Sequence, residues 1–417
     1  MNLIIKSATI IDKTSEHHGS QKDILIENGV ITQIATSLEN SQNYETISLE
    51  NLHISQGWFD SSVSLGEPGF EERETIENGL KTAAKSGFTA IAVNPNAHPI
   101  ADTKADISYL KSKAFGNIVD LHPIGALTNA SKSVDLAEVF DMKNAGAVAF
   151  GDYQKAVKNP NLLKIALLYA DNFDGLVLSF PQEDDIVGKG IVNEGYNSTR
   201  LGLKGMPSLA EELHVARDLF LLEYTKGKLH IPTISTAKSV ELIRKAKAKG
   251  LNVSCSVAIH NLVLTDDELE GFDTNYKVLP PLRTENDRKA LIAGIEDGTI
   301  DMVTSDHNPI DVEHKKVEFD NALYGTIGLE SAFGALQTIF DTETTIKMLS
   351  AGKERFGVET SAIAVGQTVN LTLFNPEGSY TFSNEHIHSS SQNSAFLGKK
   401  LKGSVYGIVH KNQKLIS

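Results

Sequence analysis

The residues in this sequence best suited to chemistry are the neighbouring Asp306 and His307, in the stretch "TSDHNP". They follow the short apolar run Ile300–Val303, which is typical of a buried β-strand. An aspartate at the end of a strand can serve as a general base or bind a metal ion. The alternative is that Asp306 caps the following loop and that His307 is a polar residue with satisfied hydrogen bonds. The dipeptide taken alone favours this alternative.

Two other histidine pairs could bind a metal. His386 and His388 flank one residue, so on a β-strand both imidazoles would lie on one face. They occur in a C-terminal β region without an Asp or His at useful spacing, which favours exposed polar positions on an outer strand or loop. His17 and His18 lie in a polar turn and have the same interpretation. The single cysteine, Cys255, falls within an apolar strand and is expected to be a small buried hydrophobic residue.

The elements that would position these residues repeat along the chain. After residue 55, short apolar runs alternate with helical patterns. The first such helix, in "ERETIENGLKTAAKSG", has apolar residues at helical spacing and Gly87 as a suitable C-terminal cap. The eight predicted strands are Gly57–Val63, Thr89–Val93, Val119–Ile124, Ala147–Phe150, Gly175–Phe180, Lys228–Ile234, Leu251–Val257 and Ile300–Val303.

Eight such units predict an α/β protein with a (β/α)8 TIM barrel. Helices over Leu329–Phe340 and Ile346–Phe356 would complete it. In this fold the active site lies at the C-terminal ends of the strands. Those ends carry, in order, Ser62, Ser64, Asn94, Asn96, Asp152, Phe180, Thr233, His260, Asp306 and His307.

Strand-and-turn patterns flank the barrel on both sides. Near the N-terminus, two apolar runs around Asn28-Gly29 predict a hairpin. From about residue 360 the same pattern returns in "TVNLTLFNPEG" and "KLKGSVYGIVHKNQKLIS". We therefore expect residues 1–55 and 360–417 to form one small β-sandwich and residues 56–359 to form the barrel. The segment 181–207 is too long for a plain connector and is expected to serve a site or an interface.

Bulk properties exclude several classes of function. The chain has 417 residues and a net charge of -14, which argues against nucleic acid or an anionic membrane as partner. One cysteine cannot form an internal disulfide, which favours a reducing compartment such as the cytoplasm. No run approaches the roughly 18 apolar residues of a membrane-spanning helix.

Several motifs, in order, resemble those of dihydroorotases of the amidohydrolase superfamily. They are "GWFDSSVSLGEPG", "GFTAIAVNPNAHP", "NEGYNSTRLGLKGMPSLAEELHVARD", "VLPPLRTENDRKALIAGIEDGTIDMVTSDHNP", "GTIGLES" and "SQNSAFLGKKLKG". The resemblance spans nearly the whole chain. It implies a zinc-bearing barrel with a β-sandwich built from both chain ends. The implied reaction is the reversible cyclisation of carbamoyl aspartate to dihydroorotate in pyrimidine synthesis.

The resemblance also shows what this sequence lacks. The family's first-strand histidine ligands fall on Ser62 and Ser64, and its carboxylate-binding arginine falls on Gly66. The histidines of the fifth and sixth strands fall on Phe180 and Thr233. Polar substrate contacts are replaced by Leu279 and Ile310. The positions that match are Asn96 for substrate binding, Asp152 at the fourth-strand metal position, and the catalytic Asp306 with His307 beside it.

The losses predict an impaired or inactive enzyme with no cofactor. Serine and threonine are poor zinc ligands at neutral pH, and phenylalanine is none. Losing the metal would forgo on the order of 11 kcal/mol of water activation. We therefore expect a vestigial site in a chain that acts as a non-catalytic partner of aspartate transcarbamoylase, with which members of this family form complexes. The family's dimers and larger assemblies imply a homo-oligomer.

Two alternatives remain open. One is an active dihydroorotase in which Asp152, His260, Asp306 and His307 hold an atypical metal. The other is a sensor or an altered amidohydrolase that binds a neutral polar molecule through Ser62, Ser64, Thr233 and Asn96.

Overall fold

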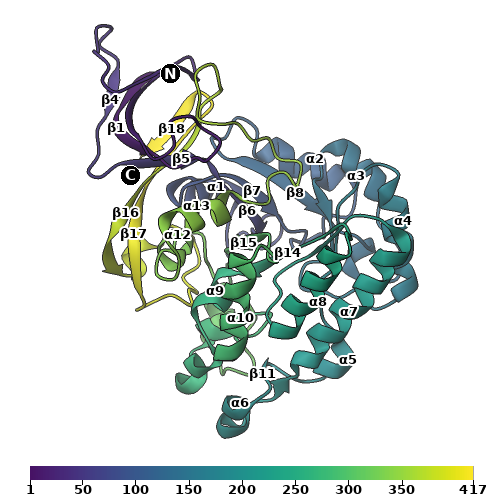
Figure 1. Ribbon diagram of the computed structural model, residues 1–417. Coiled ribbons are helices and arrows are strands. Elements are labelled where there is room, and N and C mark those ends of the chain that lie inside the picture. Colours follow the sequence, from purple (N-terminus) through teal and green to yellow (C-terminus); the bar gives the residue numbers. More distant parts are fainter. Residues whose placement is uncertain (417) are drawn as a thin grey trace.

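A computed structural model describes residues 1–416 and contains a barrel of eight parallel strands (Figure 1). All eight predicted strands are present, several of them shorter than expected. Closure between the last and first strands comes from a parallel bridge of Val63 with His307. The strands in order around the barrel are β6 (Trp58–Val63), β7 (Phe88–Val93), β8 (Asp120–Gly125), β9 (Ala149–Phe150), β10 (Val177–Leu178), β13 (Leu229–Ile231), β14 (Val253–Ala258) and β15 (Met302–Thr304).

Helices follow these strands and cover the outside of the barrel. The first begins after Thr75, whose side chain accepts a hydrogen bond from the Asn78 backbone N–H at 3.2 Å, and it is followed by Gly87 with φ of 94°. A left-handed glycine at this place ends the helix, as the sequence predicted. The main helices are α1 (Ile76–Lys85), α2 (Lys104–Lys113), α3 (Val139–Ala145), α4 (Pro160–Asp171), α7 (Ser208–Thr225), α8 (Ala237–Ala248) and α10 (Glu285–Glu296).

The last two predicted helices have different bounds in the structure. Helix α12 (Ala332–Leu336) is shorter than the predicted segment. Helix α13 (Thr342–Ser350) begins earlier, where the Asp341 side chain caps it, and ends before Gly352. That glycine has φ of 86°, which a right-handed helix does not allow.

The segment 181–207 is folded rather than irregular. It contains two short helices, α5 (Asp184–Val187) and α6 (Tyr196–Leu201), and two short paired strands, β11 (Val192–Asn193) and β12 (Gly205–Met206). Other short elements are α9 (Ile259–Val263), α11 (Val312–Lys315) and the 3-10 helices η1 (Asn129–Ser131), η2 (Asp266–Gly271), η3 (Thr274–Tyr276) and η4 (Asn384–His386).

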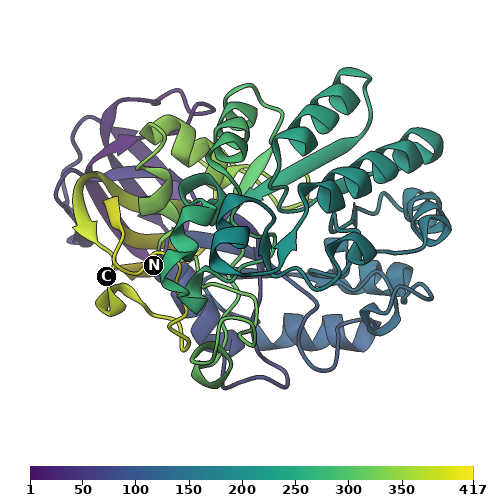
Figure 2. The ribbon, with the colours of Figure 1, turned by 90° about the horizontal axis from the view of Figure 1, so that it is seen from below.

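Both ends of the chain form a second sheet beside the barrel. The predicted hairpin is confirmed: Asn28 and Gly29 have φ of 53° and 77°, and Glu27 pairs with Val30. Figure 2 shows the purple and yellow strands of the two chain ends side by side. The strands are β1 (Asn2–Ile10), β2 (Gln21–Glu27), β3 (Val30–Ala35), β4 (Glu45–Ile47), β5 (His53–Gln56), β16 (Asn370–Thr381), β17 (Lys400–His410) and β18 (Gln413–Ile416), with β16 antiparallel to β5.

Aromatic packing joins the barrel to this second sheet. The fully buried Trp58 on β6 stacks on Phe333 of α12 at a ring-centroid distance of 5.1 Å and lies 5.9 Å from Phe374 of β16. The second sheet thereby fixes the position of β6, the strand that contains Ser62 and leads into Ser64.

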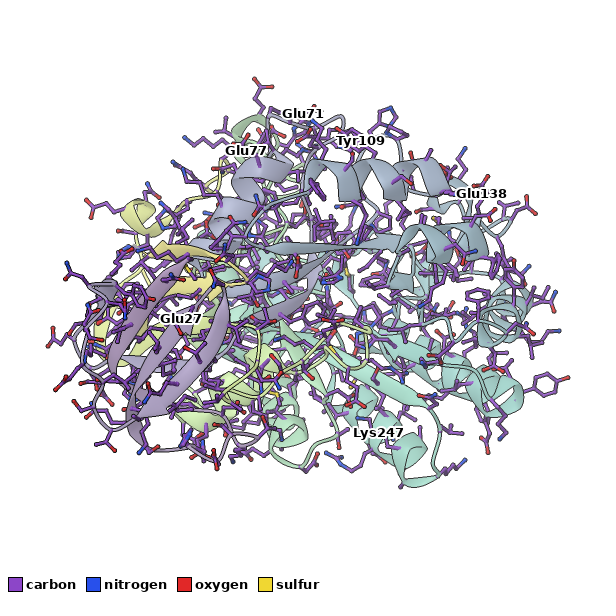
Figure 3. All side chains as sticks on the ribbon, turned by 90° about the horizontal axis from the view of Figure 1, so that it is seen from above. Glu27, Glu71, Glu77, Tyr109, Glu138 and Lys247 are labelled. Atoms are coloured by element: carbon purple, nitrogen blue, oxygen red, sulfur yellow. The ribbon has the colours of Figure 1, made fainter. Side chains whose placement is uncertain are left out.

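Acidic side chains populate the surface. The labelled Glu71, Glu77 and Glu138 lie at the edge of the molecule in Figure 3. Within residues 1–416, no helix is both long enough and apolar enough to cross a membrane.

Candidate functional site

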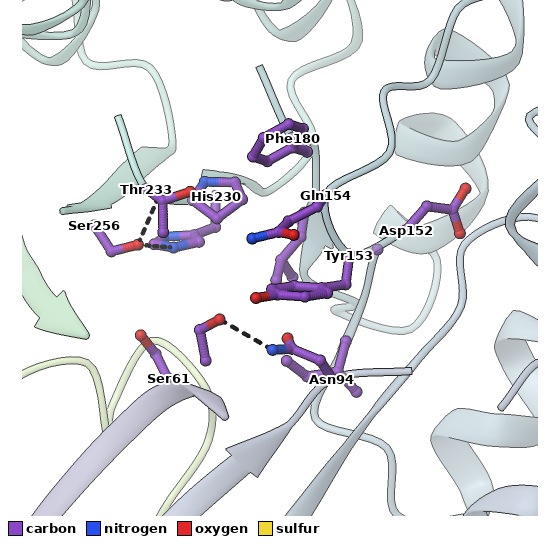
Figure 4. A pocket seen from close by; sticks show the side chains of 14 residues that line it. Ser61, Asn94, Asp152, Tyr153, Gln154, Phe180, His230, Thr233 and Ser256 are labelled. Carbon is purple, nitrogen blue, oxygen red and sulfur yellow. Dashed lines mark hydrogen bonds between the residues drawn. The ribbon is translucent and has the colours of Figure 1, made fainter. Parts of the chain in front are cut away.

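A small cavity lies at the C-terminal ends of the barrel strands, where the fold places active sites (Figure 4). Its free volume is about 30 Å³, which is enough for water but not for a ring-sized substrate. Five of the residues predicted from the sequence line it: Ser62, Asn94, Asp152, Phe180 and Thr233. The other lining residues are Ser61, Ile124, Gly151, Tyr153, Gln154, Leu178, His230, Pro232 and Ser256.

Hydroxyl and amide groups at the first two strand ends bond to one another. The Asn94 amide nitrogen donates to Ser62 Oγ at 3.1 Å and lies 3.2 Å from Ser64 Oγ. Asn96, the predicted substrate contact, donates to Ser64 Oγ at 3.0 Å. These side chains therefore bond mainly to one another, although Asn96 Oδ1 is buried without a partner among the described residues.

Asp306 is buried without a cationic partner, and the carboxyl group of Asp60 also acts on it. Its Oδ1 accepts hydrogen bonds from Ser62 Oγ at 2.9 Å and from the Tyr153 hydroxyl at 3.2 Å. Burial is the largest influence on this carboxyl group and raises its pKa to about 7. The carboxyl group that would need to be ionised in a general base is thus about half protonated at neutral pH.

The carboxylate of Asp152 faces away from the cavity centre (Figure 4). It accepts hydrogen bonds from the Leu127 N–H at 3.1 Å, the Thr128 N–H at 3.2 Å and the Thr128 hydroxyl. Burial raises its pKa despite these donors. Asp152 therefore fixes the loop after β8. Its carboxylate and that of Asp306, the two that match the family pattern, do not point toward a shared space.

The two histidines of the predicted site lie outside the lining of the cavity. His307 is buried, and its Nδ1 accepts the backbone N–H of Gly328 at 3.2 Å, which secures the barrel seam. His260 is 1% exposed on α9, and neither ring nitrogen has a partner among residues 1–416. Burial lowers the pKa of His260 to about 3, so the ring is neutral at physiological pH.

Apolar side chains pack around Phe180, which lines the cavity. Phe180 and Leu279 pack with Met206, and Val187 and Tyr324 pack against them. We call these five residues the apolar plug. Met206 and Val187 come from segment 181–207, so this segment packs against Phe180 at the edge of the cavity. Ile310 follows β15 by a few residues and is buried. Its backbone N–H donates to Asn393 Oδ1 at 3.1 Å.

A buried arginine anchors segment 181–207. Arg283 donates from Nη1 to Asn193 Oδ1 at 3.0 Å and to the Met206 carbonyl at 3.1 Å. Asn193 in turn donates to Asp266 Oδ2 at 2.8 Å. Arg283 therefore holds the plug through the Met206 backbone, in addition to the apolar contacts among its side chains.

Sequence reasoning missed several side chains of the cavity, chiefly Tyr153, Gln154 and His230. His230 lies inside strand β13, and its Nδ1 and Nε2 lie 2.9 Å and 3.2 Å from the hydroxyls of Ser254 and Ser256. Burial lowers its pKa to about 3. A histidine within an otherwise apolar strand is the signal that could have identified it.

Gly66, where the family resemblance implies a substrate-binding arginine, has no room for a side chain. A Cβ atom there would lie 1.9 Å from the Phe70 carbonyl oxygen. The loop closes on itself, since the Phe70 N–H donates to the Gly66 carbonyl at 2.8 Å and the Gly66 N–H donates to the Glu74 carbonyl at 2.9 Å. The backbone itself thus excludes an arginine at this position.

Replacing Gly66 with alanine is expected to lower the free energy of unfolding by about 1–3 kcal/mol, because the added methyl group must displace backbone. Urea denaturation measures the change. Gly271→Ala is the matched control, since a Cβ at Gly271 meets nothing within 4 Å. Equal stability of both variants and the parent would contradict the described loop.

A serine, a histidine and a glutamate also lie together behind the cavity. Ser179 Oγ is 3.4 Å from His214 Nε2, and His214 Nδ1 is 3.1 Å from Glu183 Oε1. Arg217 contacts the same Nε2 at 2.8 Å, and the fully buried Ser179 donates to Asp218 instead. The serine is neither activated nor accessible, so this group is structural.

The donor set does not fit zinc. Among residues 1–416, no three His, Cys, Asp or Glu side chains converge to hold a metal ion. His386 and His388 are not on a strand, because His386 ends the 3-10 helix η4 and its Nδ1 contacts Ser383. The cavity offers mostly serine, threonine and amide groups, which are weak ligands for zinc, and its Asp152 and His230 are bonded to Thr128 and to Ser254 and Ser256.

Comparisons with known proteins identify the family. The "Dihydro-orotase-like" family model matches residues 53–239. The dihydroorotase of Acetivibrio thermocellus is 40% identical over 412 residues, covering 97% of this chain and 96% of that protein. That of Pelotomaculum thermopropionicum is 40% identical over 410 residues, with coverage of 97% and 96%.

A solved structure shares the fold. The L-hydantoinase (dihydropyrimidinase) from Arthrobacter aurescens superposes with a TM-score of 0.86 at 20% identity, over 100% of this chain and 96% of that one. With relatives 40% identical along almost its whole length, the chain belongs to the dihydroorotase family.

Proposed function

We propose that this chain is a non-catalytic member of the dihydroorotase family that serves pyrimidine biosynthesis through contacts with other proteins. The observation that carries the proposal is the state of the cavity. Several of its polar side chains bond to one another, Phe180 of the apolar plug lines it, and no set of metal ligands converges in the described residues. The bonded side chains and the plug oppose substrate binding, and the missing ligands oppose binding of the zinc that the family's reaction uses.

The free energy that zinc would contribute to water activation supports the same conclusion, because the residues present cannot replace it. A bound zinc lowers the pKa of water from 15.7 to about 7, which corresponds to on the order of 11 kcal/mol. General base catalysis by Asp306 would supply about 10²–10⁴-fold, or roughly 3–5 kcal/mol. Without a guanidinium at Gly66, the substrate carboxylate also has no bidentate partner there.

The first test measures metal and turnover together. After incubation with zinc and gel filtration, we expect far less than one zinc per chain and no cyclisation of carbamoyl aspartate above the buffer rate. Asp306→Asn is the matched control and should give the same background. About one zinc per chain, with turnover that Asp306→Asn abolishes, would contradict the proposal.

Aspartate transcarbamoylase is the proposed partner, because the family resemblance implies complexes with that enzyme. The intact frame around the plugged cavity supports a role for the protein's surface, since segment 181–207 remains folded and anchored by the buried Arg283. Mixing the two purified proteins should give a complex of defined mass by mass photometry. Separate species, with unchanged transcarbamoylase assembly in cells lacking this chain, would refute the partnership.

The geometry argues against the two alternatives. An atypical metal site would need Asp152 and His307, but their side chains bond to the loop at residues 127–128 and to the Gly328 N–H. A neutral ligand larger than water would exceed the free volume of about 30 Å³. The zinc and turnover measurement tests the first alternative, and a thermal-shift screen with pyrimidine intermediates tests the second.

A further inference from the structure

A second cavity lies between the barrel and the sheet formed by the chain ends. It is bounded by the end of α1, by α12 and by the hairpin of β16 and β17, and Figure 1 shows α12 beside this hairpin. Its residue Ser86 directly precedes β7, so the cavity lies toward the N-terminal ends of the barrel strands, away from the small cavity at their C-terminal ends. Its free volume of about 470 Å³ is within the roughly 300–1,000 Å³ of ligand pockets. We call it the hairpin cavity.

The charged side chains of the hairpin cavity are mostly acidic. Glu330, Glu377, Glu385 and Lys85 line it. None of these four residues takes part in an ion pair among residues 1–416. Three carboxylates and one ammonium group leave the lining with a net negative charge that the described chain does not neutralise. Such a cavity favours a cationic ligand.

Two buried oxygen atoms of the lining have no hydrogen-bond partner among residues 1–416. Ser86 is 5% exposed, and its Oγ is unpaired. Glu330 Oε1 accepts the backbone N–H groups of His388 and Ser389 at 3.1 Å and 3.0 Å, whereas Glu330 Oε2 accepts nothing. A buried polar atom without a partner costs about 1–3 kcal/mol. Glu330 is therefore positioned through one oxygen, and its other oxygen is left for a donor from outside the chain.

Two aromatic rings line the hairpin cavity beside these carboxylates. The His386 ring lies 4.8 Å from the Tyr380 ring between centroids, and the two planes make an angle of 30°. His386 Nδ1 accepts the Ser383 backbone N–H at 3.2 Å, which fixes the orientation of the imidazole. Flat aromatic faces next to a carboxylate suit a guanidinium group, which is planar, cationic and rich in N–H donors.

Other cations fit the hairpin cavity less well. A metal ion lacks ligands, because no three His, Cys, Asp or Glu side chains converge among residues 1–416. An ammonium group is a compact point charge without a flat face to place against the rings.

We propose that the hairpin cavity binds a ligand through a guanidinium group, with Glu330 Oε2 as acceptor and the rings of Tyr380 and His386 against its plane. Two sources offer this group: a free arginine-like molecule, and an arginine side chain of a peptide. The proposal goes beyond the proposed function, because it concerns a different cavity and holds whether or not the barrel cavity is catalytic.

Isothermal titration calorimetry on the full chain tests the proposal with L-arginine and with N-acetyl-L-arginine amide. L-citrulline is the matched control ligand, since a neutral urea group replaces its guanidinium. We expect one site per chain for L-arginine and at least about 10-fold weaker binding of L-citrulline, because a hydrogen bond to a charged group contributes about 1.5–3 kcal/mol. Equal binding of both arginine compounds would assign the site to an arginine side chain, and binding of L-arginine alone would assign it to a free molecule.

Three variants locate the binding in the hairpin cavity. Glu330→Gln, Glu385→Gln and Tyr380→Leu should each weaken arginine binding, with the largest loss, about 10-fold or more, in Glu330→Gln. Glu359→Gln removes the same charge at an exposed position outside the lining and should have no effect. Circular dichroism and thermal unfolding verify that each variant folds. The proposal is overturned if neither arginine compound binds, if L-citrulline binds equally well, or if Glu330→Gln and Glu385→Gln bind like the parent.

Discussion

Asp306→Asn is expected to raise the free energy of unfolding by about 4 kcal/mol at pH 8. Burial raises the pKa of Asp306 from 3.8 to about 7, so the folded protein favours the protonated carboxyl group. The folded state binds more protons than the unfolded state between pH 4 and pH 7, and the unfolding free energy therefore falls as pH rises through that window. Three pKa units at about 1.4 kcal/mol each give this magnitude.

Urea denaturation at several pH values measures the effect of Asp306→Asn. The advantage of the variant should shrink by about 3 kcal/mol between pH 8 and pH 5, as the parent carboxyl group becomes protonated. Asp171→Asn, at an exposed position, serves as the control. A variant that is less stable than the parent at pH 8 would mean that the ionised carboxylate is favoured in the folded protein, as a metal or a cation would make it.

Acid should destabilise the protein steeply below pH 6.5. Burial lowers the pKa of His122 to about 4 and those of His230 and His260 to about 3. The unfolded chain therefore binds three more protons at these rings as pH falls through 6.5, and stability is lost on the acid side. Asp306, Asp60 and Asp152, whose pKa values burial raises, work in the opposite direction. The three histidines by themselves lower the free energy of unfolding by up to about 4 kcal/mol per pH unit in this range.

His260→Leu isolates one of these three contributions. The slope of unfolding free energy against pH should decrease by about 1.4 kcal/mol per unit between pH 6.5 and pH 4. Stability at pH 7 should change little, because the ring nitrogens have no partner among the described residues and leucine supplies similar apolar volume. His98→Gln, at an exposed position, should leave the slope unchanged. An unaltered slope in His260→Leu would show that this ring titrates normally.

Local patterns were sufficient for the fold. The hairpin at Asn28-Gly29 follows from two adjacent residues that tolerate positive φ, and the strands follow from short apolar runs. The ends of α12 and α13 were misjudged, because apolar spacing continues past the place where Gly352 breaks the helix. Capping and breaking residues decide such boundaries more than periodicity does.

The site was harder to predict because its geometry depends on residues distant in sequence. Nothing adjacent to Asp152 indicates that its carboxylate faces Leu127 and Thr128, about 25 positions earlier. The apolar plug likewise joins Phe180 to Leu279, about 100 positions later. Residue identities therefore indicated which groups were lost, and the folded structure was needed to show what took their place.

The apolar plug also opposes single substitutions toward the residues that the family resemblance implies at this site. Returning histidine to position 180 alone would put a polar ring between Met206 and Leu279, without the other ligands that give it a metal to bind. An arginine at position 66 would first require a different loop backbone. Each of these two substitutions is thus unfavourable when made alone. The apolar plug and the loop at Gly66 together oppose a stepwise change toward the residues that the family resemblance implies.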